Sequence, residues 1–187
     1  AKIVSIMGRY YGMDRDRRWE RIEKAYTCLT QANGPHATST AEAISKAYAD
    51  GKTDEFIIPT NIVKDGEQPT VIKKGDAVIF FNFRIDRPRE LTKAFVLDDF
   101  ENQANIAKSF DPYAIKYFKT HAPQQTAVLT PPFKRGVKIE NLLFITMTEY
   151  EKDLPVDIIF PPIVVQLPLG RVIAENDLSQ LRMSESE

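Results

Sequence analysis

Residues 77–81 form an unbroken apolar run, Ala-Val-Ile-Phe-Phe, which Gly75 and Asp76 introduce. A run without polar alternation is typical of a strand that is buried on both faces, as in a parallel or mixed sheet. Residues 141–148 are predicted to form a second buried strand. With helical patterns before and between them, these strands predict an α/β fold: a mixed, mainly parallel sheet flanked by helices.

The first predicted helix carries a buried stripe. Four apolar side chains recur at spacings of three and four residues, namely Trp19, Ile22, Tyr26 and Leu29. Such spacing places them on one face of a helix. An acidic residue, Asp14 or Asp16, is expected to satisfy the first-turn amides, and residues 33–35, Asn-Gly-Pro, to end the helix.

The remaining elements follow from turn and cap signals. An Asp-Gly pair within residues 64–67 predicts a β-hairpin. Other predicted elements are a strand over residues 3–7, a helix from Ser39 or Thr40 to Asp50 with Ala43, Ile44, Ala47 and Tyr48 inward, and a helix from Asp86. Toward the C-terminus we expect short helices within residues 98–138, an exposed loop at residues 130–136, and a short helix from Leu169 or Gly170 to about Asn176.

Composition narrows the class of protein. The chain has 25 Lys and Arg against 26 Asp and Glu, a formal net charge of -1, and 43% hydrophobic residues. This balance excludes the basic profile of a general nucleic-acid binder and the low hydrophobicity of a disordered chain. A single cysteine, Cys28, can form no internal disulfide, so a reduced cytoplasm is the expected compartment. No apolar run reaches the roughly 20 residues of a membrane span.

The charge is distributed unevenly. Residues 149–187 contain three Lys or Arg, eight Asp or Glu and four prolines. The change in composition indicates a linker entering a different unit. We therefore place a boundary at residue 160, with residues 161–187 as the linker and the beginning of the next unit.

Two arginine-bearing segments directly follow predicted strands, residues 8–21 and residues 82–89. Ligands of open α/β sheets bind beyond the carboxyl ends of strands, so neighbouring strands would direct both segments into one crevice. Planar guanidinium groups bind phosphate and carboxylate oxygens in pairs, which predicts a small polyanionic ligand. The candidate ligand-binding residues are Arg9, Arg15, Arg84 and Arg87, whereas Arg17, Arg18 and Arg21 have the spacing of a solvated helix face.

Candidates for catalysis are scarce. His36 and His121 are predicted to be exposed loop residues, and Cys28 is predicted to lie in the core. Asp14 and Asp86 are expected to cap helices or hold arginines. The chain has neither a Gly-x-Ser-x-Gly motif nor a glycine-rich phosphate loop, so the sequence predicts a ligand-binding chain without a nucleophile of its own.

The first arginine segment reads Gly-Arg-Tyr-Tyr-Gly-Met-Asp-Arg-Asp-Arg-Arg-Trp-Glu-Arg, and residues 81–87 read Phe-Asn-Phe-Arg-Ile-Asp-Arg. Both resemble signatures of the cofactor-independent (2,3-bisphosphoglycerate-independent) phosphoglycerate mutases. Residues 54–59, 147–150 and 180–185 are also similar to that family, so the resemblance spans essentially the whole chain. Departures are Ile85, where the family usually has Pro, residues 167–171, and the weakly matching residues 101–140.

The resemblance implies a cytoplasmic isomerase of glycolysis and gluconeogenesis that interconverts 3-phosphoglycerate and 2-phosphoglycerate through a phosphoserine intermediate. It implies two Mn²⁺ ions in an alkaline-phosphatase-like domain and no requirement for 2,3-bisphosphoglycerate. A separate phosphotransferase domain would bind the substrate, with Arg9, Arg15, Arg84 and Arg87 as the substrate-binding arginines.

The family's nucleophilic serine, metal-ligand clusters and active-site lysine have no counterpart in these residues. The resemblance therefore implies a fragment: residues 1–160 as the later part of the phosphotransferase domain, residues 161–187 as the return toward the phosphatase domain, and a missing phosphatase domain as partner. Such a fragment is expected to be inactive alone. The alternative is a non-catalytic module that binds a phosphorylated metabolite or RNA, and the near-zero net charge argues against RNA.

Overall fold

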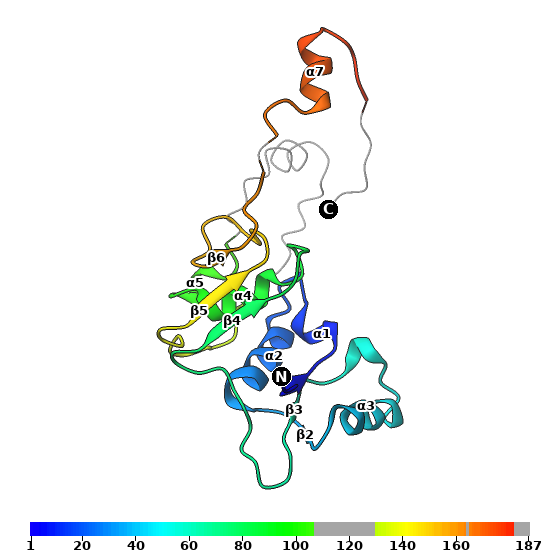
Figure 1. Cartoon of the computed structure of the whole chain (residues 1–187), viewed down its shortest axis with the longest axis vertical. Helices are drawn as coiled ribbons and strands as arrows, with labels where there is room; N and C mark the ends of the chain where they lie inside the picture. Colours follow the sequence, from blue (N-terminus) through cyan, green and yellow to red (C-terminus); the bar gives the residue numbers. More distant parts are fainter. Residues whose placement is uncertain (107–129, 164, 182–187) are drawn as a thin grey trace.

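The computed structural model describes residues 1–106, 130–163 and 165–181. Within them lie two three-stranded sheets with helices packed between and around them (Figure 1). This arrangement confirms the predicted mixed α/β class.

The first sheet has the order β1-β3-β2. β1 (Ser5–Ile6) runs antiparallel to β3 (Thr60–Ile62), whereas β2 (His36–Ala37) runs parallel to β3. The antiparallel pair of the fold thus joins the N-terminal strand to β3.

The predicted hairpin around residues 64–67 has a different outcome. The turn forms with Gly66 at a φ of 79°, but residues 68–72 form no strand. The N–H of Ile72 instead donates to the carbonyl oxygen of Leu29 at 2.8 Å. The returning arm leaves β3 because it is held by the preceding helix, so the hairpin prediction was wrong in its second arm.

The second sheet is parallel throughout, in the order β4-β5-β6. It contains β4 (Ala77–Phe80), β5 (Leu143–Thr146) and β6 (Asp157–Ile158). Both strands predicted from apolar runs, β4 and β5, are confirmed, and they lie side by side.

One face of β4 is covered and the other is open. Val78 and Phe80 pack against the main core, but Ile79 and Phe81 are 60% and 74% exposed. The prediction that this strand is buried on both faces was therefore wrong for the described residues, which place their helices against the Val78 side only.

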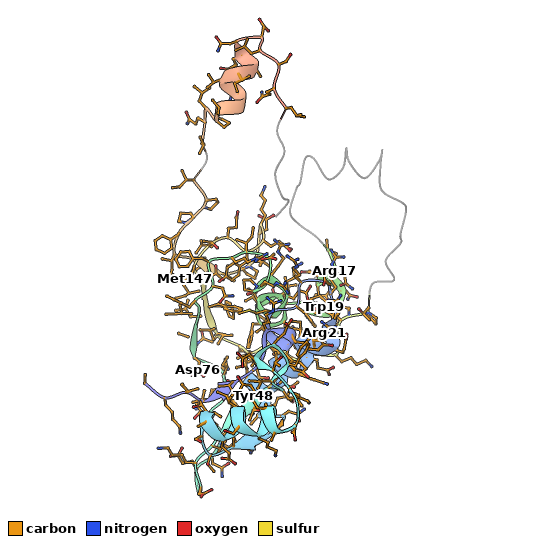
Figure 2. The ribbon with its side chains drawn as sticks, turned by 90° about the vertical axis from the view of Figure 1, so that its right-hand side faces the viewer. Arg17, Trp19, Arg21, Tyr48, Asp76 and Met147 are labelled. Atoms are coloured by element: carbon orange, nitrogen blue, oxygen red, sulfur yellow. The ribbon has the colours of Figure 1, made fainter. Side chains whose placement is uncertain are left out.

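The main core lies between that sheet and two helices, α2 (Trp19–Gln31) and α4 (Arg89–Val96). The predicted stripe is confirmed, since Trp19 and Ile22 are fully buried and the ring of Tyr26 lies 4.9 Å from that of Phe95. Figure 2 shows Trp19 beside Arg17 and Arg21 at the start of α2. Burial of this stripe holds the arginine segment against the core.

The predicted second helix is α3 (Thr40–Ala49). Ser39 Oγ accepts the N–H of Glu42 at 3.2 Å, while the Glu42 carboxylate accepts the N–H of Thr38 at 2.7 Å, a reciprocal cap that explains the starting point. Ala43 and Ala47 are buried as expected, but Tyr48 is 54% exposed and hydrogen-bonds to the Asp54 carboxylate, so its inward assignment was wrong.

Four shorter helices complete the described residues: α1 (Arg9–Gly12), the 3-10 helix η1 (Asp54–Phe56), α5 (Phe100–Gln103) and α7 (Leu169–Glu175). The C-terminal helix agrees with its prediction and lies at the opposite end of the elongated molecule from α3 (Figure 1). The short helices predicted around Phe110, Tyr113 and Tyr117 fall outside the described residues.

The segment predicted as an exposed loop, residues 130–136, is only partly exposed. Phe133 and Arg135 are buried. The Arg135 guanidinium donates to the carbonyl oxygens of Ala94 at 3.1 Å, Leu97 at 2.6 Å and Asp98 at 3.0 Å. It thereby satisfies carbonyl groups at and just beyond the C-terminal end of α4.

Arg135→Ala is expected to lower the free energy of unfolding by about 2 to 4 kcal/mol, because it leaves buried carbonyl groups without donors. Chemical denaturation of the chain measures this loss. The matched control is Lys134→Ala, an exposed neighbour in the same segment, with an expected change under about 0.5 kcal/mol. Equal losses in the two variants would show that Arg135 is not the anchor of this segment.

Candidate anion-binding site

The first arginine segment begins at a close backbone contact. A Cβ atom on Gly8 would lie 2.1 Å from the carbonyl oxygen of Glu55, and the N–H of Gly8 donates to Ile57 at 2.8 Å. Only glycine fits there. This contact places Arg9 beside Glu55, with which it forms an ion pair at 3.2 Å.

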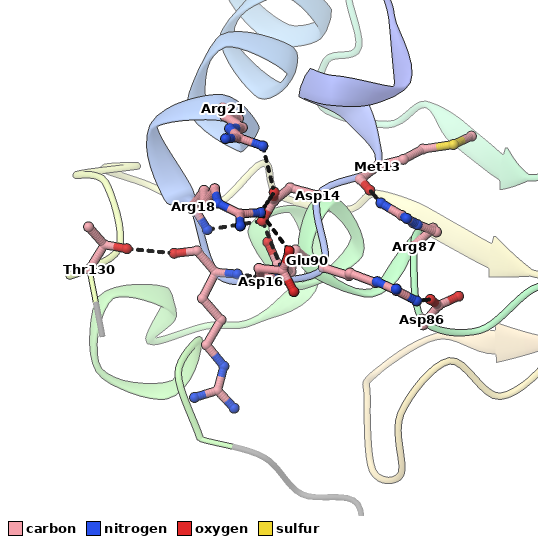
Figure 3. A network of polar contacts seen from close by, with 11 residues as sticks. Met13, Asp14, Asp16, Arg18, Arg21, Asp86, Arg87, Glu90 and Thr130 are labelled. Atoms are coloured by element: carbon pink, nitrogen blue, oxygen red, sulfur yellow. Dashed lines mark hydrogen bonds and ion pairs between the residues drawn. The ribbon is translucent and has the colours of Figure 1, made fainter. Parts of the chain in front are cut away.

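Asp14 is the organising residue of this segment. Its carboxylate is buried and accepts the N–H groups of Asp16 at 2.9 Å and Arg18 at 3.0 Å. It also pairs with the guanidinium groups of Arg18 at 3.1 Å and Arg21 at 3.3 Å (Figure 3). Burial raises the pKa of Asp14, but these donors outweigh burial and hold it below its usual value.

The backbone turn that follows Asp14 determines where α2 begins. Arg17 has a φ of 60°, an unusual conformation for a residue with a side chain, so the helix begins only at Trp19. The prediction that Asp14 or Asp16 satisfies the first-turn amides was wrong, because Asp14 accepts the N–H groups of Asp16 and Arg18, which precede the first turn of α2. Arg18 and Arg21 are half-buried partners of that carboxylate, so their assignment to a purely solvated face was wrong.

The two arginine segments meet at Asp86. Arg15 Nη1 lies 2.8 Å from Asp86 Oδ2, and Arg84 Nε lies 2.7 Å from Asp86 Oδ1. Arg87 Nη1 donates to the carbonyl oxygen of Met13 at 3.1 Å. The contact was predicted, but its predicted cause was wrong: β1 and β4 belong to different sheets, and the segments meet loop to loop.

Asp86 holds arginines, as the sequence predicts. Partial burial raises its pKa, but the Arg15 and Arg84 guanidinium groups outweigh burial and lower it to about 2. The carboxylate therefore remains charged and keeps both guanidinium groups in a defined orientation.

Glu90, in the first turn of α4, lies beneath the first segment. Its Oε1 accepts the N–H of Arg17 at 2.7 Å, while Thr130 Oγ1 donates to the carbonyl oxygen of Arg17 at 2.7 Å (Figure 3). Loss of solvation, reinforced by the charges of Asp14 and Asp16, raises the pKa of Glu90 to about 7.

A cavity of about 530 Å³ opens between the two segments and α4. Five of its lining side chains are cationic, namely Arg15, Arg17, Arg84, Arg89 and Lys93, and three are acidic, namely Asp86, Glu90 and Glu151. Lys93 is buried, which lowers its pKa, and it pairs with Glu151 at 2.9 Å. Within the described residues, no carboxylate forms an ion pair with the guanidinium group of Arg17. This surplus of cationic groups suits an anionic ligand.

The predicted arginines are divided between two hollows. Arg15 and Arg84 line the larger cavity, whereas Arg9 and Arg87 line a second one of about 270 Å³ together with Arg18 and Arg21. The loop at residues 13–18 contributes to both. Sequence reasoning did not single out Glu90, Arg89, Lys93 and Glu151. A usable signal was the placement of Arg, Glu and Lys at residues 89, 90 and 93 on the helix predicted to begin at Asp86.

Other candidates remain outside this site. Cys28 is buried, as predicted; burial raises its pKa to about 11, and Sγ lies 3.3 Å from Asn61 Oδ1. His36 is exposed, as predicted, but it lies in strand β2 rather than in a loop, and His121 falls outside the described residues. In the described part of the chain, no three His, Cys, Asp or Glu side chains form a metal-binding group. The described helices include none that is long and apolar enough to cross a membrane.

Comparison with known proteins identifies relatives of the whole chain. The family model "BPG-independent PGAM N-terminus" matches residues 1–152. The 2,3-bisphosphoglycerate-independent phosphoglycerate mutase of Chloroflexus aggregans is 42% identical over 99% of this chain and 33% of the relative. The enzyme of that name from Moorella thermoacetica is 40% identical over 99% of this chain and 30% of the relative.

A solved structure agrees with these relatives. The crystal structure of Leishmania mexicana phosphoglycerate mutase at low cobalt concentration is similar with a TM-score of 0.61 and 28% identity, over 87% of this chain and 25% of that protein. The chain thus spans about a third of the length of the curated relatives it matches.

The Asp86→Asn variant tests the junction of the two arginine segments, where Arg15 and Arg84 pair with Asp86. The pKa of Asp86 is lowered in the folded chain, so its contribution to stability is present above pH 3.8 and is lost as the pH falls toward 2. The variant is expected to lose about 1 to 2 kcal/mol of unfolding free energy at pH 7 and less than about 0.5 kcal/mol at pH 2, where Asp86 is about half protonated in the folded chain. Urea denaturation across this range measures it, with Asp65→Asn in an exposed turn as control. A loss that is the same at every pH would contradict the ion-pair assignment.

Proposed function

This chain belongs to the BPG-independent phosphoglycerate mutase family, and on that premise we propose that it supplies the substrate-binding arginines of a longer enzyme that interconverts 3-phosphoglycerate and 2-phosphoglycerate. The transferred phosphoryl group would pass through a serine located elsewhere in that enzyme. The reaction is a step of glycolysis and gluconeogenesis, and we assign the enzyme to the cytoplasm.

The observation that carries the proposal is the junction at Asp86. Arg15, which is 71 residues from Asp86 in sequence, and Arg84 bind opposite oxygens of the Asp86 carboxylate. Phosphoglycerate carries a carboxylate and a phosphate, both of which accept paired hydrogen bonds from guanidinium groups. A site that is already oriented loses less entropy when the ligand binds.

The residues of this chain would bind the substrate, orient it and neutralise its negative charge. We assign Arg15 and Arg84 to one anionic group of the substrate, and Arg9 and Arg87 to the other. Their positive charges would stabilise the charge on the phosphoryl oxygens during transfer. Because the loop at residues 13–18 contributes side chains to both cavities, this loop would set the separation of the two anionic groups.

Two Mn²⁺ ions are expected from the family resemblance, and they would activate the serine and the phosphoryl group in the phosphatase domain. The described residues of this chain do not fit a metal, since they hold no group of three potential ligands. We therefore assign no step of this chain's chemistry to the ions. No dependence on added 2,3-bisphosphoglycerate is expected.

The domain assignment follows from the same reasoning. We propose that residues 1–160 are the later part of the phosphotransferase domain and that residues 161–187 lead back toward the phosphatase domain. Coverage of only 30% to 33% of the curated relatives supports a large partner segment in the same protein. That segment would supply the nucleophile and the metal site.

The Arg84→Ala variant of the full-length protein tests the substrate role. Loss of one guanidinium group is expected to raise KM for 3-phosphoglycerate at least about tenfold, because it binds the substrate, and to lower kcat, because its interaction with the phosphoryl oxygens strengthens in the transition state. A coupled assay with Mn²⁺ measures both constants. Lys64→Ala, in an exposed turn, is the control. Unchanged constants for Arg84→Ala would overturn the assignment.

A second experiment tests whether this chain alone is insufficient for mutase activity. The 187-residue chain, assayed alone with Mn²⁺ and 3-phosphoglycerate, is expected to produce no 2-phosphoglycerate, because the proposed nucleophile and metal site lie outside it. The full-length protein serves as the positive control. Turnover by the isolated chain, retained after repurification, would contradict this division of labour.

A further inference from the structure

We propose that Glu90 is a positioning residue whose protonated carboxyl group donates a hydrogen bond to Asp14 and thereby holds the arginine-bearing loop in its binding conformation. This inference rests on the proposed function for its effect on substrate binding. The protonation of Glu90 can be measured independently of activity.

The two carboxyl groups hold the same short stretch of backbone: Asp14 accepts the N–H groups of Asp16 and Arg18, and Glu90 accepts the N–H of Arg17 between them. Each carboxyl group also shifts the pKa of the other. Asp14 and Glu90 are only 3% and 5% exposed. Two adjacent carboxylates with so little solvent cannot both be ionised without strong repulsion, and a shared proton removes that repulsion.

The hydrogen bonds indicate which residue holds the proton. Asp14 accepts two backbone N–H groups and two guanidinium groups, all of which favour its charged form. Glu90 accepts a single N–H, from Arg17. Among the described residues, its Oε2 is buried and finds no donor. A proton on Glu90 converts this unsatisfied carboxyl group into a donor.

The cations near Glu90 are engaged with other partners. Lys93, one helical turn further along α4, pairs with Glu151 at 2.9 Å, and Arg89 Nε donates to the carbonyl oxygen of Tyr150 at 2.9 Å. No ion pair with Glu90 exists within the described residues. Among the described residues, the charged and titratable groups around the Asp14–Glu90 pair are Asp16, Arg17, Arg18 and Arg21 from the loop and α2, and Arg89, Lys93 and Glu151 from α4 and the segment after β5.

Two further effects shift the protonation equilibrium of Glu90 in opposite directions. The first-turn position in α4 favours the charged form of Glu90 modestly. Burial beside Asp14 opposes it more strongly, in agreement with a pKa raised to about 7. The neutral form therefore dominates below neutral pH.

The proton affects both the loop and the cavity. Neutral Glu90 would hold the Asp14 carboxylate in place while it accepts the N–H of Arg17. Asp14 in turn accepts the N–H of Asp16, so the two carboxyl groups together hold the backbone next to Arg15. Ionised Glu90 would repel Asp14 and add negative charge to the wall of the 530 Å³ cavity. Since the folded pKa lies above the ordinary value of 4.5, stability falls as the pH rises from about 4.5 to 7. Affinity for an anion falls through the same titration.

Glu90→Gln and Glu90→Ala in the full-length enzyme separate these effects, because glutamine can donate to Asp14 at every pH and alanine cannot. At pH 6.5, Gln is expected to stay within about twofold of wild type in KM for 3-phosphoglycerate, while Ala raises KM about tenfold. Between pH 6.5 and 8.5, the ratio of wild-type KM to Gln KM is expected to rise. This ratio cancels the titration of the substrate. Glu20→Gln, at the same first-turn position of α2 but exposed, is the matched control.

A measurement without activity addresses the proton itself. The ¹³C carboxyl signal of Glu90 in the 187-residue chain is expected to titrate near pH 7, and the thermal midpoint of wild type is expected to fall relative to Glu90→Gln over pH 5 to 8.5. A Glu90 signal that titrates near pH 4.5, or equal KM increases for Gln and Ala, would overturn the inference. If the full-length protein shows no mutase activity, the proposed function fails, and the carboxyl titration still decides where the proton resides.

Discussion

A single buried carboxylate, Asp14, determines how the arginine-bearing part of the molecule is built. It accepts backbone N–H groups from the two residues that turn the chain toward α2, and it pairs with the guanidinium groups of Arg18 and Arg21. An unpaired buried carboxylate is strongly unfavourable, so each of these donors is required by the burial of Asp14. Because α2 packs its stripe against the parallel sheet, this carboxylate connects the loop to the core.

The site depends on a balance between repulsion and orientation. Several guanidinium groups held near each other repel, and intervening carboxylates offset that repulsion: Asp86 between Arg15 and Arg84, and Glu151 beside Arg89 and Lys93. These carboxylates leave a net positive charge in the cavity while they orient the donors. A net positive charge in the cavity suits an anionic ligand such as the proposed substrate class.

Much of the framework could be predicted from local patterns. The stripe from Trp19 to Leu29, the cap at Ser39 and the two apolar strands are each encoded within one element, and each is found. The hairpin after β3 failed because the N–H of Ile72 binds Leu29, a residue distant in sequence, rather than its neighbouring strand. The open face of β4 was missed because an apolar run does not specify which of the two faces of a strand is covered by the other described elements.

The site was predictable only in part for the same reason. Arginine-rich segments after strands are visible in sequence, and these segments do meet. The pairing of Lys93 with Glu151 and the placement of Glu90 under Arg17 join residues 58 and 73 positions apart, so no local pattern contains them. Nor does spacing reveal that one loop separates the four arginines into two hollows.

The central claim is that Arg15 and Arg84, from two distant segments, act as one anion-binding unit. A double-mutant cycle in the full-length enzyme, with Arg15→Ala, Arg84→Ala and both together, tests it through kcat/KM for 3-phosphoglycerate. The account predicts a coupling energy of about 1 kcal/mol or more, because both side chains are oriented by Asp86 and bind one substrate group. Effects that add to within about 0.3 kcal/mol would contradict it.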